Sequence, residues 1–390
     1  MIGNLDTESI TIGAVTSPRV GRITAGDDNV SAVVERAVNV SIEGLRQMFR
    51  ADDGLFAFTR KRQRNGSLQL QDVSLRYSAI SALGGRRLPE ALQRRVFGGR
   101  TARDYVTGLV ARLNRVTNLG DTALIYWAAA ESGHFDLKHA LECLQQRTAG
   151  ASRPLTVEMA WTLAALAACR DGREVRAASV SAAERLLGAF RHDSGLFPHY
   201  LEPKRGPWYR SHVGSFADQI YPVQALARYH TAFGDSEALA AAAKCAEQLC
   251  CTQGADGQWW WHYDVRTGEV IEGYPVYSVH QDSMAPMALM DLREAGGPDH
   301  SDAIRRGLRW MVVAPEIRRS LIDEERSVIW RKVARAESRK AVRLLRTLAS
   351  RVHPHLRLRG FDHLCPPTSV DYECRPYHLA WVLYAWLGGK

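Results

Sequence analysis

Two stretches of the chain repeat one order of residues, "ADQIYPVQAL" and "QDSMAPMAL". In each, an acid stands four residues before a proline, Asp218 before Pro222 and Asp282 before Pro286. Proline is tolerated in the first turn of a helix, and an acid there interacts favourably with the helix dipole, so both stretches predict helix starts. Weaker copies, an acid followed by an apolar run, occur at Asp72, at Asp121, at Glu158 and at Asp371 with Glu373.

The runs that follow these acids are apolar almost all round, which predicts buried helices. Between them lie more charged, amphipathic segments. We expect exposed helices at 31–50, 101–115, 134–148, 175–191, 236–251 and 300–312. Pairing each exposed helix with the buried helix after it gives six helical hairpins. Together with the lack of any convincing run of alternating strands, this predicts an all-α fold, an (α/α)6 toroid with an inner ring of helices inside an outer ring.

The chain has 390 residues, enough for one large core or for two ordinary domains. Because the six pairs span nearly all of it, we predict a single domain over 1–390. An N-terminal extension covers 1–30. The last pair carries a long insertion, 313–370, in front of its buried helix.

Within this insertion, the segment 331–359 carries ten Lys or Arg residues and one Glu. Apolar residues fall at helical spacing from Ala341 to Val352, which predicts a basic amphipathic helix. One interpretation is a solvated basic face above a small apolar seam that packs on the domain. The other is a surface for an anionic substrate or for anionic lipid, and so a peripheral membrane contact. The segment has no interleaved aromatic residues, so we expect no nucleic-acid partner.

The bulk properties narrow the class of protein. The formal net charge is +9, and the hydrophobic fraction of 46% is ordinary for a globular chain. The first residues lack a secretory-signal pattern, and no stretch approaches the roughly 20 apolar residues of a membrane span. The seven scattered cysteines fit a reducing compartment. We therefore expect a cytoplasmic protein, either free or membrane-associated through 331–359. No phosphate loop, dinucleotide fingerprint or Gly-x-Ser-x-Gly elbow occurs.

A second repeated element precedes three of the buried helices. The stretches "DDGLFAF", "DSGLFPHY" and "ADGQWWWHY" share a glycine turn, two hydrophobic positions and an aromatic residue. Glycine permits the left-handed backbone that ends an exposed helix. A long connection follows each turn, and long connections on a rigid scaffold often carry binding residues.

The stretch "QGADGQW" resembles the Q-x-x-x-G-x-W pattern of the terpenoid cyclase and protein prenyltransferase toroids. The "DTA" that begins at Asp121 resembles the end of the acid motif of class II terpene cyclases, and the glycine turns also resemble those of glycoside hydrolase and polysaccharide lyase toroids. The resemblance implies the toroid fold. At the two acid positions of the cyclase motif this chain has Asn118 and Gly120, so the usual D-x-D-D acid is missing.

In such a toroid all buried helices begin at one end, so their acids converge on one cavity. We expect Asp218 and Asp282 to divide acid and base roles, with Glu373 as a third candidate. His280 is a candidate general base, assisted by Tyr277 as in a β-eliminating uronate lyase. Alternatively, the acids only cap helices and His280 is a buried, hydrogen-bonded histidine.

Several other residues are predicted to bind substrate. One or two rings of the run that starts at Trp259 should pack between helices, and at least one should face the loop side, where aromatic faces stack on sugars. Arg375 would pair with an anionic group. The predicted substrate-binding residues are Trp260, Trp261, His262, Tyr372, Arg375, His212, Gln219, Gln281, Asp121 and Arg76.

A metal site has weaker support. Asp371, Cys374 and His378 lie close in sequence, with Cys365 nearby, and the resembling prenyltransferases hold zinc with an Asp, a Cys and a His. The spacing of their histidine cannot be matched here, and no C-x-x-C pattern occurs. We expect no metal or other cofactor and keep zinc as an alternative.

The leading hypothesis is a carbohydrate-active enzyme, of glycoside hydrolase or uronate lyase type, that acts on an acidic or lipid-linked saccharide. The first alternative is a terpenoid cyclase-like or prenyltransferase-like enzyme acting on an isoprenoid diphosphate. The second is a non-catalytic binding toroid. A cavity with several carboxylates, His and Arg would favour a saccharide substrate. A dry aromatic cavity with one acid would favour an isoprenoid, and a plugged cavity would favour a binding module.

Overall fold

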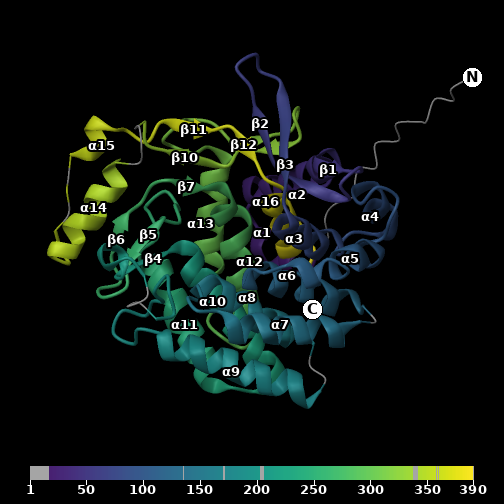
Figure 1. The fold of residues 1–390 in the computed structure, drawn as a ribbon. Coiled ribbons are helices and arrows are strands. Elements are labelled where there is room, and N and C mark those ends of the chain that lie inside the picture. The colour runs from purple at the N-terminus through teal and green to yellow at the C-terminus, as the bar shows by residue number, and fades with distance from the viewer. Residues whose placement is uncertain are drawn as a thin grey trace, which may run out of the picture.

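The computed structural model describes residues 17–389 except 135, 170–171, 203–205, 337–340, 357 and 359. Its helices form two concentric rings (Figure 1). The inner ring consists of α3 (Leu75–Gly85), α6 (Leu119–Ser132), α8 (Thr156–Ala168), α10 (Phe216–Phe233), α12 (Ala285–Glu294) and α16 (Pro376–Trp386). The outer ring consists of α2 (Asp28–Met48), α5 (Ala102–Val110), α7 (Leu137–Gly150), α9 (Arg173–Ala189), α11 (Ser236–Cys251) and α13 (Ser301–Val312).

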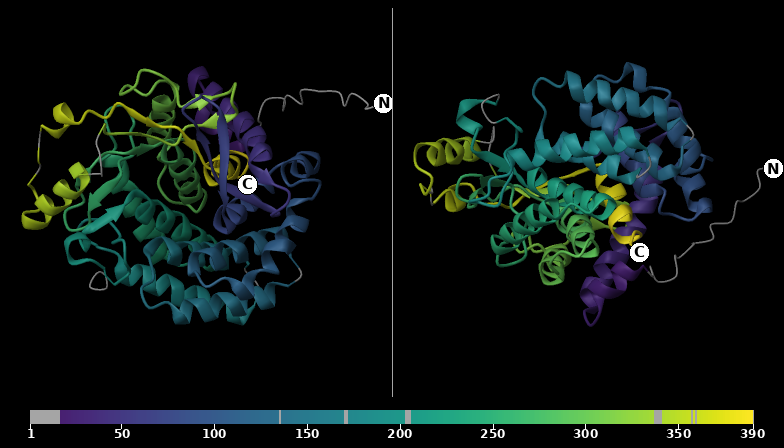
Figure 2. Two further views of the ribbon diagram at one scale, coloured as in Figure 1. Left: turned by 45° about the horizontal axis from the view of Figure 1, so that its top comes forward. Right: turned by 90° about the horizontal axis from the view of Figure 1, so that it is seen from below.

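Each inner helix packs on the next in the ring. The C-terminal α16 closes the ring because it packs on α3 and α2 and on the turn in front of α12 (Figures 1 and 2). The (α/α)6 toroid predicted from the sequence is therefore confirmed. Each expected exposed helix overlaps an outer helix, and the segment 236–251 coincides with α11.

The pairing within the rings differs from the prediction. Helices α7, α9 and α11 pack mainly on the inner helix before them, not on the one after them. The reason is the length of the connections, since only Gly234 and Asp235 separate α10 from α11. The long connections instead join outer helices to the next inner helix, and they gather at one end of the ring. We call that end, where the inner helices begin, the mouth.

The long connections contain short strands that were not predicted from the sequence. One sheet joins β1 (Phe49–Arg50), β2 (Leu55–Arg62), β3 (Leu68–Val73) and β12 (Glu373–Cys374). A second sheet joins β4 (Val213–Ser215), β5 (His262–Asp264) and β6 (Val270–Glu272), and a third joins β7 (Val276–Tyr277), β10 (Lys332–Ala334) and β11 (Ser369–Asp371). In addition, β8 (Ile322–Asp323) pairs with β9 (Val328–Ile329). Most are too short to show alternation. A signal existed for β2 and β3, because the Asn65–Gly66 dipeptide between them is a hairpin turn, with Gly66 at φ 83°.

Not every predicted helix-start acid lies in a helix. Asp72 lies in β3 with a positive φ of 47°, and Ser74 instead caps α3 by accepting the Tyr77 N–H. Asp371 and Glu373 lie in β11 and β12, ahead of α16. In the described part of the predicted extension, α1 (Pro18–Thr24) precedes α2, and 1–16 lie outside the described residues. The segment 313–370 contains α14 (Ala341–Val352) and α15 (Phe361–Leu364).

Aromatic side chains fill the ring between its two ends. Trp381 of α16 lies 5.8 Å from the Trp127 ring, and its Nε1 donates to the hydroxyl of Tyr221 at 2.9 Å. These three side chains are buried and come from three different inner helices. They form a floor below the mouth. Among the described helices, none has both the length and the apolar character that a bilayer crossing requires.

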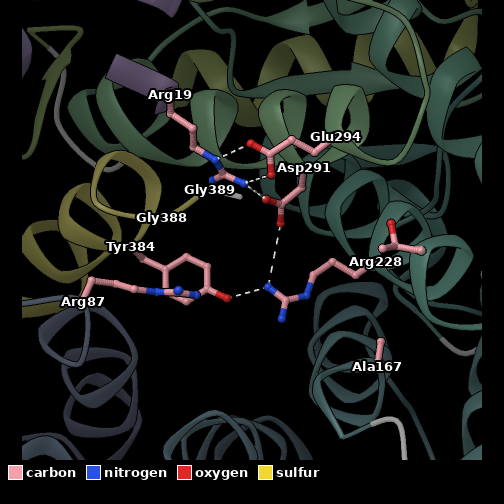
Figure 3. A pocket seen from close by; sticks show the side chains of 10 residues that line it. Arg19, Arg87, Ala167, Arg228, Asp291, Glu294, Tyr384, Gly388 and Gly389 are labelled. Carbon is pink, nitrogen blue, oxygen red and sulfur yellow. Dashed lines mark hydrogen bonds and ion pairs between the residues drawn. The ribbon is translucent and has the colours of Figure 1, made fainter. Parts of the chain in front are cut away.

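The end of the ring opposite the mouth is closed by charged side chains around a cavity of about 230 Å³ (Figure 3). Arg19 of α1 pairs with Asp291 and Glu294, both at 2.5 Å. Deeper in the ring, Glu131 pairs with Arg228 at 2.9 Å and with Arg87 at 3.0 Å. Burial alone would raise the pKa of Glu131, but Arg228 and Arg87 lower it to about 2.

This network predicts an acid dependence of stability. A carboxylate whose pKa is lowered in the folded state stabilises the protein above its ordinary pKa, and this contribution is lost as the pH falls toward the folded pKa. A fall from 4.5 to about 2 corresponds to about 3 kcal/mol. Denaturant unfolding should therefore show Glu131→Gln less stable than the wild type at pH 7, with a gap that narrows below pH 4.5. The exposed pair of Glu90 and Arg94 is the control, since Glu90→Gln should show almost no gap.

Candidate functional site

The mouth contains an accessible histidine held by a buried carboxylate. Asp218 is fully buried at the start of α10, where its Oδ2 accepts hydrogen bonds from the backbone N–H and the hydroxyl of Ser215, both at 2.7 Å. The same carboxylate pairs with Nδ1 of His199 at 3.0 Å. The His199 side chain is 31% exposed. Asp218 raises the pKa of His199, against the opposing effect of burial. An imidazole so placed can transfer protons.

A chain of polar side chains from three further inner helices extends from this pair through Glu158. Glu158 of α8 lies close enough to help raise the pKa of His199. The Asn118 amide donates to Glu158 Oε1 at 3.1 Å, and its Oδ1 accepts from Arg76 at 2.7 Å. Arg76 also pairs with Asp121 at 2.6 Å. We call His199, Asp218, Glu158, Asn118, Arg76 and Asp121 the mouth cluster. Asp121 and Arg76, two of the predicted substrate-binding residues, lie in it.

Three hydrogen bonds define how the repeats align at the mouth. In each, the backbone N–H of the aromatic residue after a glycine turn donates to a side chain 22 residues later. The pairs are Phe56 with Ser78 at 2.9 Å, Phe197 with Gln219 at 2.7 Å, and Trp259 with Gln281 at 3.3 Å. Gln219 and Gln281, predicted to bind substrate, are fully buried and instead hold the turns in place.

This register places a second repeated contact beside the first. The residue two after each aromatic contacts a residue 19 positions later, at the start of an inner helix. Phe58 stacks on Tyr77 at 5.3 Å, Trp261 stacks on His280 at 5.8 Å, and His199 pairs with Asp218. Two of the three repeats thus fill this place with stacked rings. Only the repeat of His199 fills it with two titratable groups.

Asp218 and Asp282, the predicted acid–base pair, do not occupy equivalent places at the mouth. By the register above, the counterpart of Asp218 is His280, and Asp282 lies two residues further into the ring. Asp282 is fully buried and pairs with Nε2 of His378 at 2.8 Å. The proline pattern gave the wrong alignment because His280–Met284 forms a π-helical turn in front of α12, which shifts Pro286 relative to the mouth.

His280 is also not placed as a general base. Its ring is buried and stacks on Phe216 at 4.4 Å. Burial lowers the pKa of His280 to about 3, so it is neutral. Its Nδ1 has no hydrogen-bond partner among the described residues. Tyr277 lies beside it, 4.7 Å from the Trp261 ring, and burial raises the pKa of this tyrosine.

The tryptophan run forms a wall. Trp259 is fully buried, and Trp260 packs on Tyr274 at 5.8 Å. Trp261 is half-buried in the stack with Tyr277 and His280. His262 is buried, and this burial keeps its pKa well below the ordinary value. His212, another predicted binding residue, is buried under α14, where it hydrogen-bonds Ser350 at 2.9 Å.

Other predicted residues belong to an ionic network on β12. Glu373 pairs with Arg375 at 3.1 Å, with Lys61 at 3.2 Å and with Arg331 at 3.3 Å. Burial opposes the effect, but these cations lower the pKa of Glu373, so it is an anion rather than a proton donor. Arg375 also donates to the hydroxyl of Tyr77 at 2.9 Å.

Tyr372 lies apart from that network. Its hydroxyl hydrogen-bonds Arg319, and its ring lies under Arg62 at 4.9 Å. The ring therefore already has cationic partners from this chain.

A basic cavity of about 390 Å³ opens at the mouth beside Tyr277. Its lining includes Arg331, Lys332 and Arg343, and a single acid, Asp371, pairs with the first two at 3.3 and 3.0 Å. Arg343 has no ion-pair partner in the described ranges. The cavity therefore carries excess positive charge suited to an anion. The sequence placed these cations in the basic segment without assigning them to the mouth.

The residues of the zinc alternative have other partners. Asp371 pairs with Lys332 and Arg331, and His378 pairs with Asp282. Cys374 is buried, and this burial raises the pKa of its thiol to about 12. Within the described ranges, no three His, Cys, Asp or Glu side chains gather in a way that could hold a metal ion.

The pair of His199 and Asp218 predicts a measurable titration. Because Asp218 stabilises the imidazolium, the pKa of His199 should lie above the ordinary value of about 6.5, and Asp218→Asn should lower it. Asparagine can still accept the capping hydrogen bonds, so the helix start should survive. NMR titration checks this, with the His199 signal assigned by its loss in His199→Gln. An unchanged pKa in Asp218→Asn would contradict the pairing.

Comparison with known proteins identifies the fold. No family model matches the sequence, and no curated relative does either. Among solved structures, an unsaturated glucuronyl hydrolase specific for heparin shares a TM-score of 0.58 at 13% identity, covering 93% of this chain and 96% of that chain. An unsaturated glucuronyl hydrolase of Streptococcus agalactiae in complex with dGlcA-GalNAc6S shares a TM-score of 0.57 at 12% identity over 92% and 90%. A sugar epimerase from a ruminal bacterium shares 0.55 at 11% identity over 92% and 98%. The chain therefore has the α/α toroid fold of these enzymes.

Proposed function

We propose that this protein is a carbohydrate-active enzyme that binds an anionic saccharide at the mouth and uses the His199–Asp218 pair for proton transfer. The observation that carries the proposal is that one repeat has the His199–Asp218 pair where the other two repeats have stacked rings. Stacked rings fill the equivalent place in the other repeats and stabilise the fold by about 0.5–1.5 kcal/mol per pair. Replacing them with an accessible imidazole on a buried carboxylate gives up that packing and provides an acid or base.

The chemistry follows from the environment of the two groups. Asp218 is buried and fixed by Ser215, so it orients the imidazole and favours its protonated form. A protonated His199 could donate to the leaving oxygen of a glycosidic bond, while Glu158 could accept a proton from water. In an elimination, the neutral imidazole would instead remove the proton next to a uronate carboxylate, a carbon–carbon double bond would form as the glycosidic C–O bond breaks, and water would protonate the leaving oxygen.

The basic cavity indicates the substrate class. Arg343 of this cavity and His199 of the mouth cluster both help to lower the pKa of the buried His262, after the larger effect of burial, which supports one continuous substrate site. A carboxylate or sulfate of the saccharide would pair with Arg343 and Lys332. The structural neighbours support this class, since two are described as glucuronyl hydrolases and one was crystallised with dGlcA-GalNAc6S.

The mouth chemistry favours a saccharide over an isoprenoid. Carboxylates, a histidine and several arginines surround the mouth, whereas an isoprenoid site would be dry and aromatic. A Cβ at Gly120 would lie 3.1 Å from Glu158 and from the Trp161 ring, so an acid at this position would require both side chains to shift. Asp218 and Glu158 do cap their helices, which the binding-module alternative requires.

An activity comparison tests the proton-transfer role. Purified protein is incubated with uronate-containing oligosaccharides, with hydrolysis read from new reducing ends and elimination from the ultraviolet absorbance of unsaturated products. His199→Gln should lower kcat by about 100-fold or more in a protein that still unfolds cooperatively, because general acid–base catalysis contributes at least that factor. The control is His192→Gln, an exposed histidine on the same connection. Full activity of His199→Gln would refute the role.

A binding comparison tests the substrate class. Acidic oligosaccharides should raise the melting temperature of the wild type, because a ligand of the native state stabilises it by mass action. Arg343→Gln should reduce that shift, while neutral oligosaccharides should give little shift with either protein. A shift caused by prenyl diphosphates alone would instead support the isoprenoid alternative.

A further inference from the structure

Helix α14 is seated on the domain by its polar face. Ser350 hydrogen-bonds the buried His212 at 2.9 Å, and its backbone oxygen accepts from Arg266 at 2.6 Å. Arg346 pairs with Glu272, which is buried, at 3.4 Å. The buried residues of α14 include Thr347 and Ser350. Specific polar contacts therefore determine which face of this helix points inward.

The apolar face of α14 points to solvent. Leu344 is 50% exposed and Val352 is 83% exposed, and Leu345 and Leu348 lie exposed between them. The expected small apolar seam packed on the domain is therefore wrong, because the hydrogen bonds of Ser350 and Arg346 turn it outward. Exposure of four neighbouring aliphatic side chains to water is unfavourable and is typical of an interaction surface.

A fifth apolar side chain extends this surface. Trp208, in the short helix η3 (Trp208–Arg210) that packs on α14, is 69% exposed. In the described part of the chain ten large apolar side chains are exposed, of which six lie between Leu344 and Leu364 and a seventh is Trp208. Helix α14 lies at the outer edge of the molecule, away from both rings (Figure 1). We call Leu344, Leu345, Leu348, Val352 and Trp208 the α14 patch.

The surroundings of the α14 patch are basic. Arg351 on α14 and Arg210 beside Trp208 are exposed, and neither has an ion-pair partner among the described residues. The acids nearby are already paired, Asp362 with Arg335 and Glu269 with His355. An apolar helix face flanked by unpaired arginines is the combination that binds an anionic bilayer surface, since the aliphatic side chains enter the headgroup region and the cations meet the lipid phosphates.

We propose that the α14 patch docks this protein on the surface of an anionic lipid bilayer, with the mouth beside the membrane. The position of the mouth follows from Arg343, which lies on α14 and also lines the basic cavity. A saccharide attached to lipid would then reach the mouth without leaving the surface. A second copy of the chain is less suitable, because a contact between two α14 patches would bring the unpaired arginines of both copies, Arg351 and Arg210, into one interface without added acids.

Vesicle flotation tests the proposal. The wild type should float with vesicles of equimolar phosphatidylcholine and phosphatidylglycerol and should remain behind with phosphatidylcholine alone. The combined change Leu344→Gln, Leu348→Gln and Val352→Gln should lower the partition coefficient at least tenfold, because each aliphatic side chain removed from water contributes to binding. Added salt should weaken binding, since part of the attraction is electrostatic.

The control variant changes three exposed valines outside the patch, Val73→Gln, Val180→Gln and Val313→Gln, and should float as the wild type does. Both variants should keep the wild-type melting temperature, because the altered side chains are exposed. Failure of the wild type to bind anionic vesicles, or equal binding of the α14 variant, would overturn the proposal. So would a concentration-dependent dimer in light scattering that the α14 variant abolishes. The proposal does not rest on the catalytic one, because flotation requires no turnover.

Discussion

The mouth depends on one repeated hydrogen bond. A side chain at the start of an inner helix (Ser78, Gln219) or in the turn before one (Gln281) accepts the backbone N–H of the aromatic residue that follows a glycine turn. Gln219 also donates back to the carbonyl of Phe197 at 2.8 Å, so both of its polar ends are satisfied although it is fully buried. This bond and the short sheets together fix the long connections over the inner helices, so that the residues two places later meet their partners.

That geometry gives equivalent positions different chemistry. His199 and His280 both belong to the second repeated contact, one on a turn and the other on a helix. Asp218 raises the pKa of the first, whereas burial against aromatic rings lowers the pKa of the second to about 3. The residue type alone therefore does not decide which histidine can exchange protons near neutral pH. The partner across the contact decides it.

The toroid could be predicted from the sequence because the inner and outer helices differ in the periodicity of their hydrophobic residues, which is a local property. The positions of Asp121 and Arg76 at the mouth could also be predicted from local sequence, because both residues lie near the starts of inner helices. The alignment of the repeats at the mouth could not be predicted from the sequence. The π-helical turn at His280–Met284 displaces Pro286, so that Asp282 looked equivalent to Asp218. The proposed role of His199 depends on a partner 19 residues away, Asp218. The orientation of α14 could not be predicted either. Its hydrophobic pattern defines an apolar face but does not say whether that face points toward the domain or toward solvent.

The aromatic floor formed by Trp127, Tyr221 and Trp381 has a consequence for the shape of any ligand. Because these rings fill the middle of the toroid and charged side chains close its far end, the molecule is a cup and not a tunnel. A polymer cannot thread through it. Only a chain terminus or a short branch can reach the bottom, and whatever is released must leave by the opening through which it came.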